Sequence, residues 1–305
     1  MAHSIPDSAS LVCSTSLSAP ADLRRVRLDL AYDGRHFHGW AKQIGQRTVQ
    51  GEIEAAFQQI LRRPVPVTVA GRTDAGVHAL GQVAHTDLAE RELGDPQHLT
   101  RRLNSILAMR AAPITGDPRG HADTVIHSIQ AVSGDFDARF SALARHYEYR
   151  IATKQTHPLN PLNRGHTWWV ETRNPLDLAA MREFAASLLG EHDFLSFCKP
   201  RPGATTIRTL QAFDVNEGKE ALCLHVQADA FCHSMVRSLV GAIVKVGAGQ
   251  KPASWSRELL EHPSREHSLS IAPAHGLTLV KVDYPPQEEW ASRAAATRRV
   301  REECC

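Results

Sequence analysis

The chain has 305 residues, enough for one large domain or two modest ones with a substantial core. Its 35 lysines and arginines are almost offset by 33 acidic residues, and the net charge of +2 excludes a protein that is basic over its whole surface, so any surface for nucleic acid must be local. No run of about 18 apolar residues is present and residues 1–22 lack a signal-peptide core, which predicts a cytoplasmic protein without membrane contact.

The first half of the chain has the periodicities of a mixed α and β fold. Residues 1–22 are rich in Ser, Ala and Pro, which favours a disordered leader. Alternating or helical spacing then predicts, in chain order, a strand at 26–32, a helix at 53–61, a strand at 65–69, an extended segment at 82–88, a helix capped by Asp95 with its apolar stripe at 99–107, and a strand at 125–132. The polar stretch 116–124 is interpreted as a surface insertion.

The second half repeats this mixture. Tyr147, Tyr149 and Ile151 share one face of a predicted strand over 146–151. Further elements are predicted as a helix started by Asn174-Pro175 and closed by Gly190, strands at 205–215 and 221–228 joined as a hairpin, a helix at 235–246, and a final strand at 276–283. This order predicts an α+β fold of two subdomains, 23–135 and 136–287, with mainly antiparallel sheet, helices on one face, and a tail at 288–305.

The segment Gly71 to His85, GRTDAGVHALGQVAH, places an acid on a loop that follows a strand. Arg72 and Asp74 are two residues apart, so in an extended chain both side chains project to one face and the guanidinium favours the charged carboxylate. The structural alternative is an Asx-turn, in which Asp74 bonds backbone amides and Gly76 takes a positive φ.

RTDAGVHALGQV resembles the signature of the tRNA pseudouridine synthase A family. Other blocks resemble the same family in the same order, and together they span about residues 25–285: YDG at 32–34 with FHGW at 37–40, FDARFSALARHYEY at 136–149, DFLSF at 193–197, RTL at 208–210, Phe231 through MVR at 235–237, and Gly276-Leu277. Residues 198–207 and the insertion at 116–124 depart from the pattern of the family. Because such loops would contact the RNA, the resemblance predicts the reaction better than it predicts where the RNA binds.

The resemblance implies two pseudo-related halves that join their sheets around a central active-site cleft. It implies an isomerase that needs no cofactor and no metal, and that breaks the bond between ribose and N1 of uracil and rejoins the base through C5. In this reading Asp74 is the essential carboxylate, Arg237 pairs with it, and Tyr147 lines the uracil face and serves the final proton transfer. Without the resemblance, the interpretation of Tyr147 as a core tyrosine of a strand is favoured, and Arg237 can be interpreted as a surface cation of a helix.

The same resemblance implies that the target uridine is flipped out of its stem. Arg72 then occupies the vacated space and Leu277 is an apolar wall against the base, although Leu277 alone reads as ordinary core. The implied partners are tRNA, modified in the anticodon stem-loop at positions 38–40, and a second copy of the chain in a two-fold homodimer that grips one tRNA across both subunits.

Two further expectations concern cysteines and metals. The six cysteines form no CxxC and no ligand spacing, which predicts free thiols in a reducing compartment. His78 and His85 lack the i, i+4 spacing of a zinc pair.

Three other functions are alternatives for this sequence. The first is a synthase of the same fold that acts on a different uridine or RNA. The second is a catalytically silent RNA-binding module, which would keep a basic groove and lose the carboxylate. The third, an aspartate phosphotransferase or metal-dependent hydrolase, needs a second acid near Asp74 or a metal triad, and the sequence offers neither.

Overall fold

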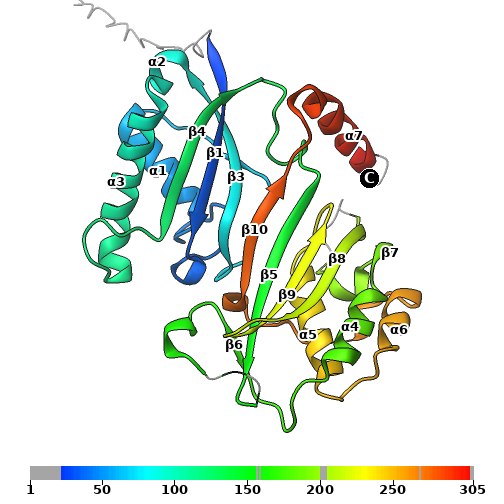
Figure 1. Ribbon diagram of the computed structural model, residues 1–305. Coiled ribbons are helices and arrows are strands. Elements are labelled where there is room, and N and C mark those ends of the chain that lie inside the picture. The colour runs from blue at the N-terminus through cyan, green and yellow to red at the C-terminus, as the bar shows by residue number, and fades with distance from the viewer. Residues whose placement is uncertain (1–21, 156, 158, 200–204, 268, 303–305) are drawn as a thin grey trace, which may run out of the picture.

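The computed structural model describes residues 22–155, 157, 159–199, 205–267 and 269–302 (Figure 1). The predicted leader therefore lies, except for Asp22, outside the described residues, as do the middle of the 198–207 segment and the last three residues of the predicted tail. Within the described ranges, no helix is both long and apolar enough to cross a membrane.

The described strands form one sheet of ten strands. They are β1 (Leu23–Tyr32), β2 (Thr68–Val69), β3 (His78–Ala89), β4 (Thr124–Val132), β5 (Ala144–Thr153), β6 (Trp168–Val170), β7 (Gly190–Asp193), β8 (Ile207–Glu217), β9 (Leu222–Ala228) and β10 (Leu277–Asp283). The order is β4-β1-β3-β10-β5-β9-β8-β7, with β2 beside β3 and β6 beside β5. Only the pairings β3 with β10 and β5 with β6 are parallel. The predicted α+β fold with a mostly antiparallel sheet is confirmed.

The helices are α1 (Val49–Leu61), α2 (Glu90–Leu93), α3 (Pro96–Thr115), α4 (Leu178–Ala186), α5 (Met235–Gly247), α6 (Trp255–Glu261) and α7 (Trp290–Glu302). Alternate residues of β1 and β9 are buried and those between them are half-buried, because helices cover one face of the sheet. Figure 1 shows α1 and α3 beside the N-terminal strands, α4, α5 and α6 beside the C-terminal strands, and α7 beyond the end of β10.

The last strand of the chain, β10, lies in the middle of the sheet and joins the two halves. It runs parallel to β3, with Thr278 opposite His78 and Leu279 opposite Ala79, and antiparallel to β5. Gly81 of β3 lies so close to β10 that an added Cβ would be 2.2 Å from the Val280 carbonyl oxygen. Because one sheet runs through both halves, the subdomain boundary near residue 135 stays a prediction.

Local signals explain where elements differ from prediction. The strand expected at 65–69 pairs only over β2, since Pro64 and Pro66 alternate with the valines and have no N–H for the ladder. The helix expected from Asn174 begins instead after Asp177, whose side chain accepts from the Ala180 amide as an N-cap. The segment described only as a tail contains the helix α7.

Candidate active site

A cleft of about 530 Å³ opens where the two halves meet. All five residues proposed from the sequence line it: Asp74 and Arg72 on the loop between β2 and β3, Tyr147 on β5, Arg237 on α5 and Leu277 on β10. The fold thus brings together side chains that are far apart in the sequence.

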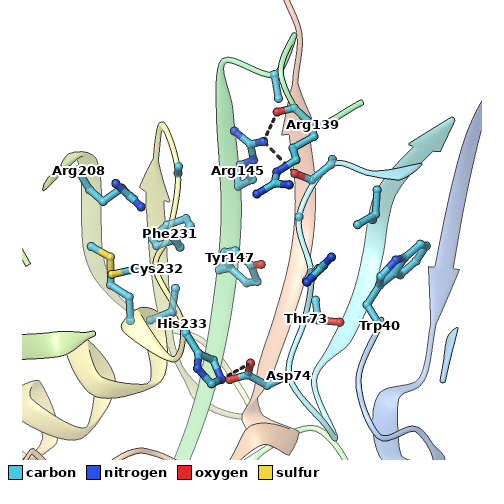
Figure 2. Close-up of a pocket in the computed structure, with 18 of the residues that line it drawn as sticks. Trp40, Thr73, Asp74, Arg139, Arg145, Tyr147, Arg208, Phe231, Cys232 and His233 are labelled. Carbon is cyan, nitrogen blue, oxygen red and sulfur yellow. Dashed lines mark hydrogen bonds and ion pairs between the residues drawn. The ribbon is translucent and has the colours of Figure 1, made fainter. Parts of the chain in front are cut away.

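The Asp74 carboxylate is held by side chains from the opposite half of the protein. Its Oδ2 lies 3.4 Å from a guanidinium nitrogen of Arg237 and accepts a hydrogen bond of 3.2 Å from Ser234 Oγ. Its Oδ1 lies 3.3 Å from His233 Nε2, as Figure 2 shows. The turn itself is closed by the backbone, with the Val77 amide donating to the Asp74 carbonyl and Gly76 at φ +80°. The predicted turn and the predicted pair with Arg237 are therefore both present.

These three partners of Asp74 come from the start of α5. Arg237 is fixed by a 2.6 Å hydrogen bond from its Nε to the Ala272 carbonyl, and Ser234 adopts the left-handed φ of 63° just before the helix. The positive end of the helix dipole favours a carboxylate at this place. Sequence reasoning missed His233 and Ser234, although their position within the HSMVR string that contains Arg237 was the available signal.

Arg72 does not pair with Asp74, which corrects the expectation of a guanidinium beside the carboxylate. Its side chain is exposed and forms no ion pair or hydrogen bond with another described residue. Residues 72–74 lie outside the strands, between a bend at Gly71 and a turn at 75–76, and the Arg72 side chain is exposed while Asp74 is partly buried. Arg72 is left at the wall of the cleft with its donors available.

A buried polar network fixes the loop behind Asp74. The Tyr32 hydroxyl is 2.8 Å from Thr73 Oγ1, and Gln82 donates both to that hydroxyl and to the Gly71 carbonyl. Burial raises the pKa of Tyr32 to about 12, so it remains a neutral phenol. The Trp40 amide donates to the Thr73 carbonyl. The loop is therefore anchored on both sides of the carboxylate.

Tyr147 and Leu277 form apolar walls of the cleft. The Tyr147 ring is 8% exposed and stands edge-on to Phe231, with ring centroids 5.2 Å apart and planes at 89° (Figure 2). Burial raises its pKa well above that of an ordinary phenol, so the side chain is neutral at pH 7. Its hydroxyl makes no hydrogen bond to any described residue. Leu277 is 5% exposed.

Cations outnumber acids around the cleft. Besides Arg72 and Arg237, the lining includes Arg139, Arg145, Lys199, Arg208 and Arg293, against the acids Asp74 and Asp229. Buried Arg145, which lies beside Arg139 in Figure 2, donates to the carbonyls of Ala70, Arg139 and Asp229 rather than to a carboxylate. The cleft is a local basic surface on a protein of small net charge.

Cys198 and Cys232 form a disulfide, so the prediction of free thiols is wrong for these two residues. Their Cα atoms lie 5.6 Å apart because the Lys199 amide donates to the His233 carbonyl and holds the two segments side by side. A separation of 34 residues hides this pairing from any spacing rule. Cys223 is a free thiol, and the other three cysteines lie outside the described residues. In the described part of the chain, no group of three or more His, Cys, Asp or Glu side chains is placed to hold a metal ion.

The sequence matches the family model described as tRNA pseudouridine synthase over residues 30–123 and 184–285. It is 50% identical over 284 residues to the tRNA pseudouridine synthase A of Frankia casuarinae, covering 92% of this chain and 96% of that protein. The chain belongs to the tRNA pseudouridine synthase family. Proteins of the same name from Streptomyces griseus and Mycobacterium leprae are 49% and 44% identical, each over 91% of this chain and over 94% and 95% of their own lengths.

The family match does not cover the cleft evenly. Asp74, Arg72, Arg237 and Leu277 lie inside the matched ranges, whereas Tyr147 lies between them and α7 lies after them. The alignments with the relatives cover more than nine tenths of the chain and therefore also span β5 and Tyr147.

Proposed function

We propose that this protein is a tRNA pseudouridine synthase that isomerises uridine to pseudouridine with Asp74 as its essential carboxylate. The observation that carries the proposal is the Asp74 carboxylate, held between Arg237, Ser234 and His233 at the base of a basic cleft. The names of the relatives agree with this chemistry.

The reaction needs no net gain or loss of atoms. The bond between C1′ and N1 breaks, the uracil turns, a bond between C1′ and C5 forms, C5 loses its proton and N1 gains one. Asp74 supplies the negative charge required whether it attacks C1′, attacks the base or removes a ribose proton. Arg237 and Ser234 orient the carboxylate, and Arg237 limits the free-energy cost of holding a charge in a half-buried place.

Tyr147 and Leu277 would bind the flipped uracil between apolar walls that exclude water from the reacting bond. We assign the final removal of the C5 proton to Tyr147, whose phenol hydroxyl makes no hydrogen bond to any described residue. As the neutral phenol accepts the proton from C5, it must release its own proton to water, and N1 of the uracil takes up a proton from water, so that no net charge is created.

The uridine must leave its stack before it enters this cleft, at a cost of a few kcal/mol. We assign Arg72 to the gap that the base leaves, because its exposed guanidinium stands at the cleft without a protein partner among the described residues. There it would bind phosphates or stack on the neighbouring base.

We place the target uridines in the anticodon stem-loop at positions 38–40, and the protein in the cytoplasm as a homodimer. A tRNA extends beyond one chain of 33.6 kDa. Because the net charge is only +2, the basic cleft of one chain gives a small contact surface for it. Light scattering that gives about twice the chain mass would support the dimer; a monomeric mass with full activity at micromolar protein would contradict it.

The deciding experiment replaces the carboxylate by an isosteric amide. Asp74→Asn should lower tritium release from C5-labelled uridine in tRNA by at least about a thousandfold, while the dissociation constant for tRNA changes by less than about threefold. Asp214→Asn, which removes an exposed acid from β8, is the matched control and should retain activity. Activity of the Asp74 variant within tenfold of wild type would reject the proposal.

The competing functions give different outcomes. A synthase of the same fold for another RNA would release tritium from that RNA and leave tRNA positions 38–40 unmodified. A silent RNA-binding module would bind tRNA and release none. Mapping pseudouridine in RNA from cells with and without the protein separates these cases.

A further inference from the structure

We propose that α7 is an RNA-binding element, in which Arg293 binds a backbone phosphate of the substrate at the wall of the active-site cleft. This inference rests on the proposed function, since it assigns a contact to the same RNA. Neither the sequence prediction of a tail nor the family match, which ends at residue 285, includes this helix.

The helix is anchored firmly at its first turn. Trp290 is 8% exposed, and its ring stands edge-on to Phe136 with centroids 4.9 Å apart. Its indole nitrogen donates to the Pro285 carbonyl at 3.0 Å, and its own carbonyl accepts from Ser141 Oγ. These contacts fix where the helix begins and in which direction it leaves the sheet.

Two faces of α7 have different environments: one packs against the protein and the other lines the cleft. Trp290 and Ala294, four residues apart, are buried against the protein. Arg293 and Thr297, also four apart, line the cleft. The anchor thus presents Arg293 to the same space that holds Asp74.

The two described arginines of α7 have different roles. Arg298 forms an ion pair of 2.7 Å with Asp137 and lies over the Phe140 ring, which attaches the helix to the loop after β4. Arg293 donates through Nε to the Ala142 carbonyl at 3.4 Å and has no carboxylate partner among the described residues. Its outer guanidinium nitrogens are therefore positioned but not neutralised.

Arg293 also faces other cations rather than acids. Arg145 lines the same cleft, and its pKa is lowered by burial and, to a smaller extent, by the charge of Arg293. Arg139 lines the cleft next to them. The acid on this side, Asp229, uses a side-chain oxygen to accept from the Thr209 and Ala230 amides. The hydrogen bonds of Arg145 and Arg293 go to backbone carbonyls rather than to carboxylates, and two such guanidinium groups at one wall of the cleft favour an anion between them.

The anion that best fits the cleft wall at Arg145 and Arg293 is the phosphodiester backbone of RNA. When the target base sits at Asp74, the backbone on either side must pass along the walls of the cleft, and a guanidinium can bind two phosphate oxygens at once. A contact to backbone gives affinity and register without selecting a base.

The test measures the salt dependence of tRNA binding by the full-length protein carrying Asp74→Asn, which prevents turnover. Adding Arg293→Gln should weaken binding roughly three- to tenfold and reduce the slope of log affinity against log salt by about one. Arg293→Lys should retain the slope. Arg91→Gln, which removes an exposed arginine from α2, is the control of equal charge and should change neither quantity.

Two further readouts separate binding from structure. In the otherwise wild-type enzyme, Arg293→Gln should raise the KM for tRNA and leave kcat and the thermal midpoint unchanged, whereas a merely structural role would lower the midpoint and leave the salt slope intact. An unchanged slope in an active enzyme would overturn the inference and leave the proposed function standing. If the slope is reduced but the wild-type protein makes no pseudouridine, the inference is supported and the proposed function is rejected.

Discussion

The junction between β3 and β10 offers a sharp test of how the fold positions the cleft. In Gly81→Ala, the new Cβ would lie 2.2 Å from the Val280 carbonyl oxygen and 3.0 Å from its carbon. An ordinary carbon to oxygen contact is about 3.3 Å, so β10 must move away from β3 by about 1 Å. The obstructing atoms belong to the backbone and cannot rotate aside. Overpacking of this kind costs about 1–3 kcal/mol of stability.

The larger effect should fall on catalysis. Asp74 is held on the β3 side of this junction, while Leu277 and Tyr147 lie on the β10 and β5 side. A shift of about 1 Å between reacting groups can lower a rate about a hundredfold. We therefore expect Gly81→Ala to reduce the single-turnover rate of tritium release about a hundredfold, with a fall of a few degrees in the thermal midpoint.

The control for this substitution is Gly134→Ala. A Cβ at Gly134 meets no atom within 4 Å, and its φ lies outside the left-handed range, so both rate and midpoint should stay at wild-type values. Both variants are assayed at a temperature well below either midpoint, so that loss of folded protein does not enter the rate. If Gly81→Ala reacts as fast as Gly134→Ala, the alignment of the two halves across β10 does not control the chemistry.

Two other substitutions test the site and its support. Tyr147→Phe should change the free energy of unfolding by no more than about 0.5 kcal/mol and leave tRNA affinity unchanged, because the lost hydroxyl has no hydrogen-bond partner among the described residues. It should slow single turnover at least about a hundredfold. Turnover at the wild-type rate would show that Tyr147 takes no part in the proton transfer. For His85, burial and then Arg25 lower the pKa to about 4, and the neutral ring accepts from the Ala138 amide. Unfolding therefore takes up a proton between pH 6.5 and 4, and the free energy of unfolding falls by up to about 3 kcal/mol as the pH drops through that range. In His85→Gln, the free energy of unfolding measured with urea should depend less on pH in this range. An equal pH dependence in both proteins would contradict the assignment.

Periodicity predicted the elements that pack against one face of the sheet. The alternation in β1 and the shared face of Tyr147, Tyr149 and Ile151 in β5 appear as expected, because local spacing alone decides which residues face the core. Prolines and caps decided the ends: Pro66 shortens the valine strand and Asp177 delays α4.

The contacts of the site depend on pairings over long sequence distances, which no local pattern contains. Asp74 meets Arg237 across 163 positions, a pairing that came from family resemblance rather than from spacing. The contact of His233 with Asp74 depends on how the start of α5 meets the Asp74 loop, and the Cys198–Cys232 disulfide depends on how residues 198–199 lie beside 232–233, so local patterns predicted neither.

The central place of β10 has a consequence for how the protein is made on the ribosome. Residues 277–283 are synthesised after about nine tenths of the chain, and until then β3 and β5 are both edge strands with unpaired N–H and C=O groups. A nascent chain can form each half early, but it cannot unite them. We therefore expect truncated chains that end before Leu277 to aggregate through these open edges, and a complete cleft to exist only in chains whose translation has nearly finished.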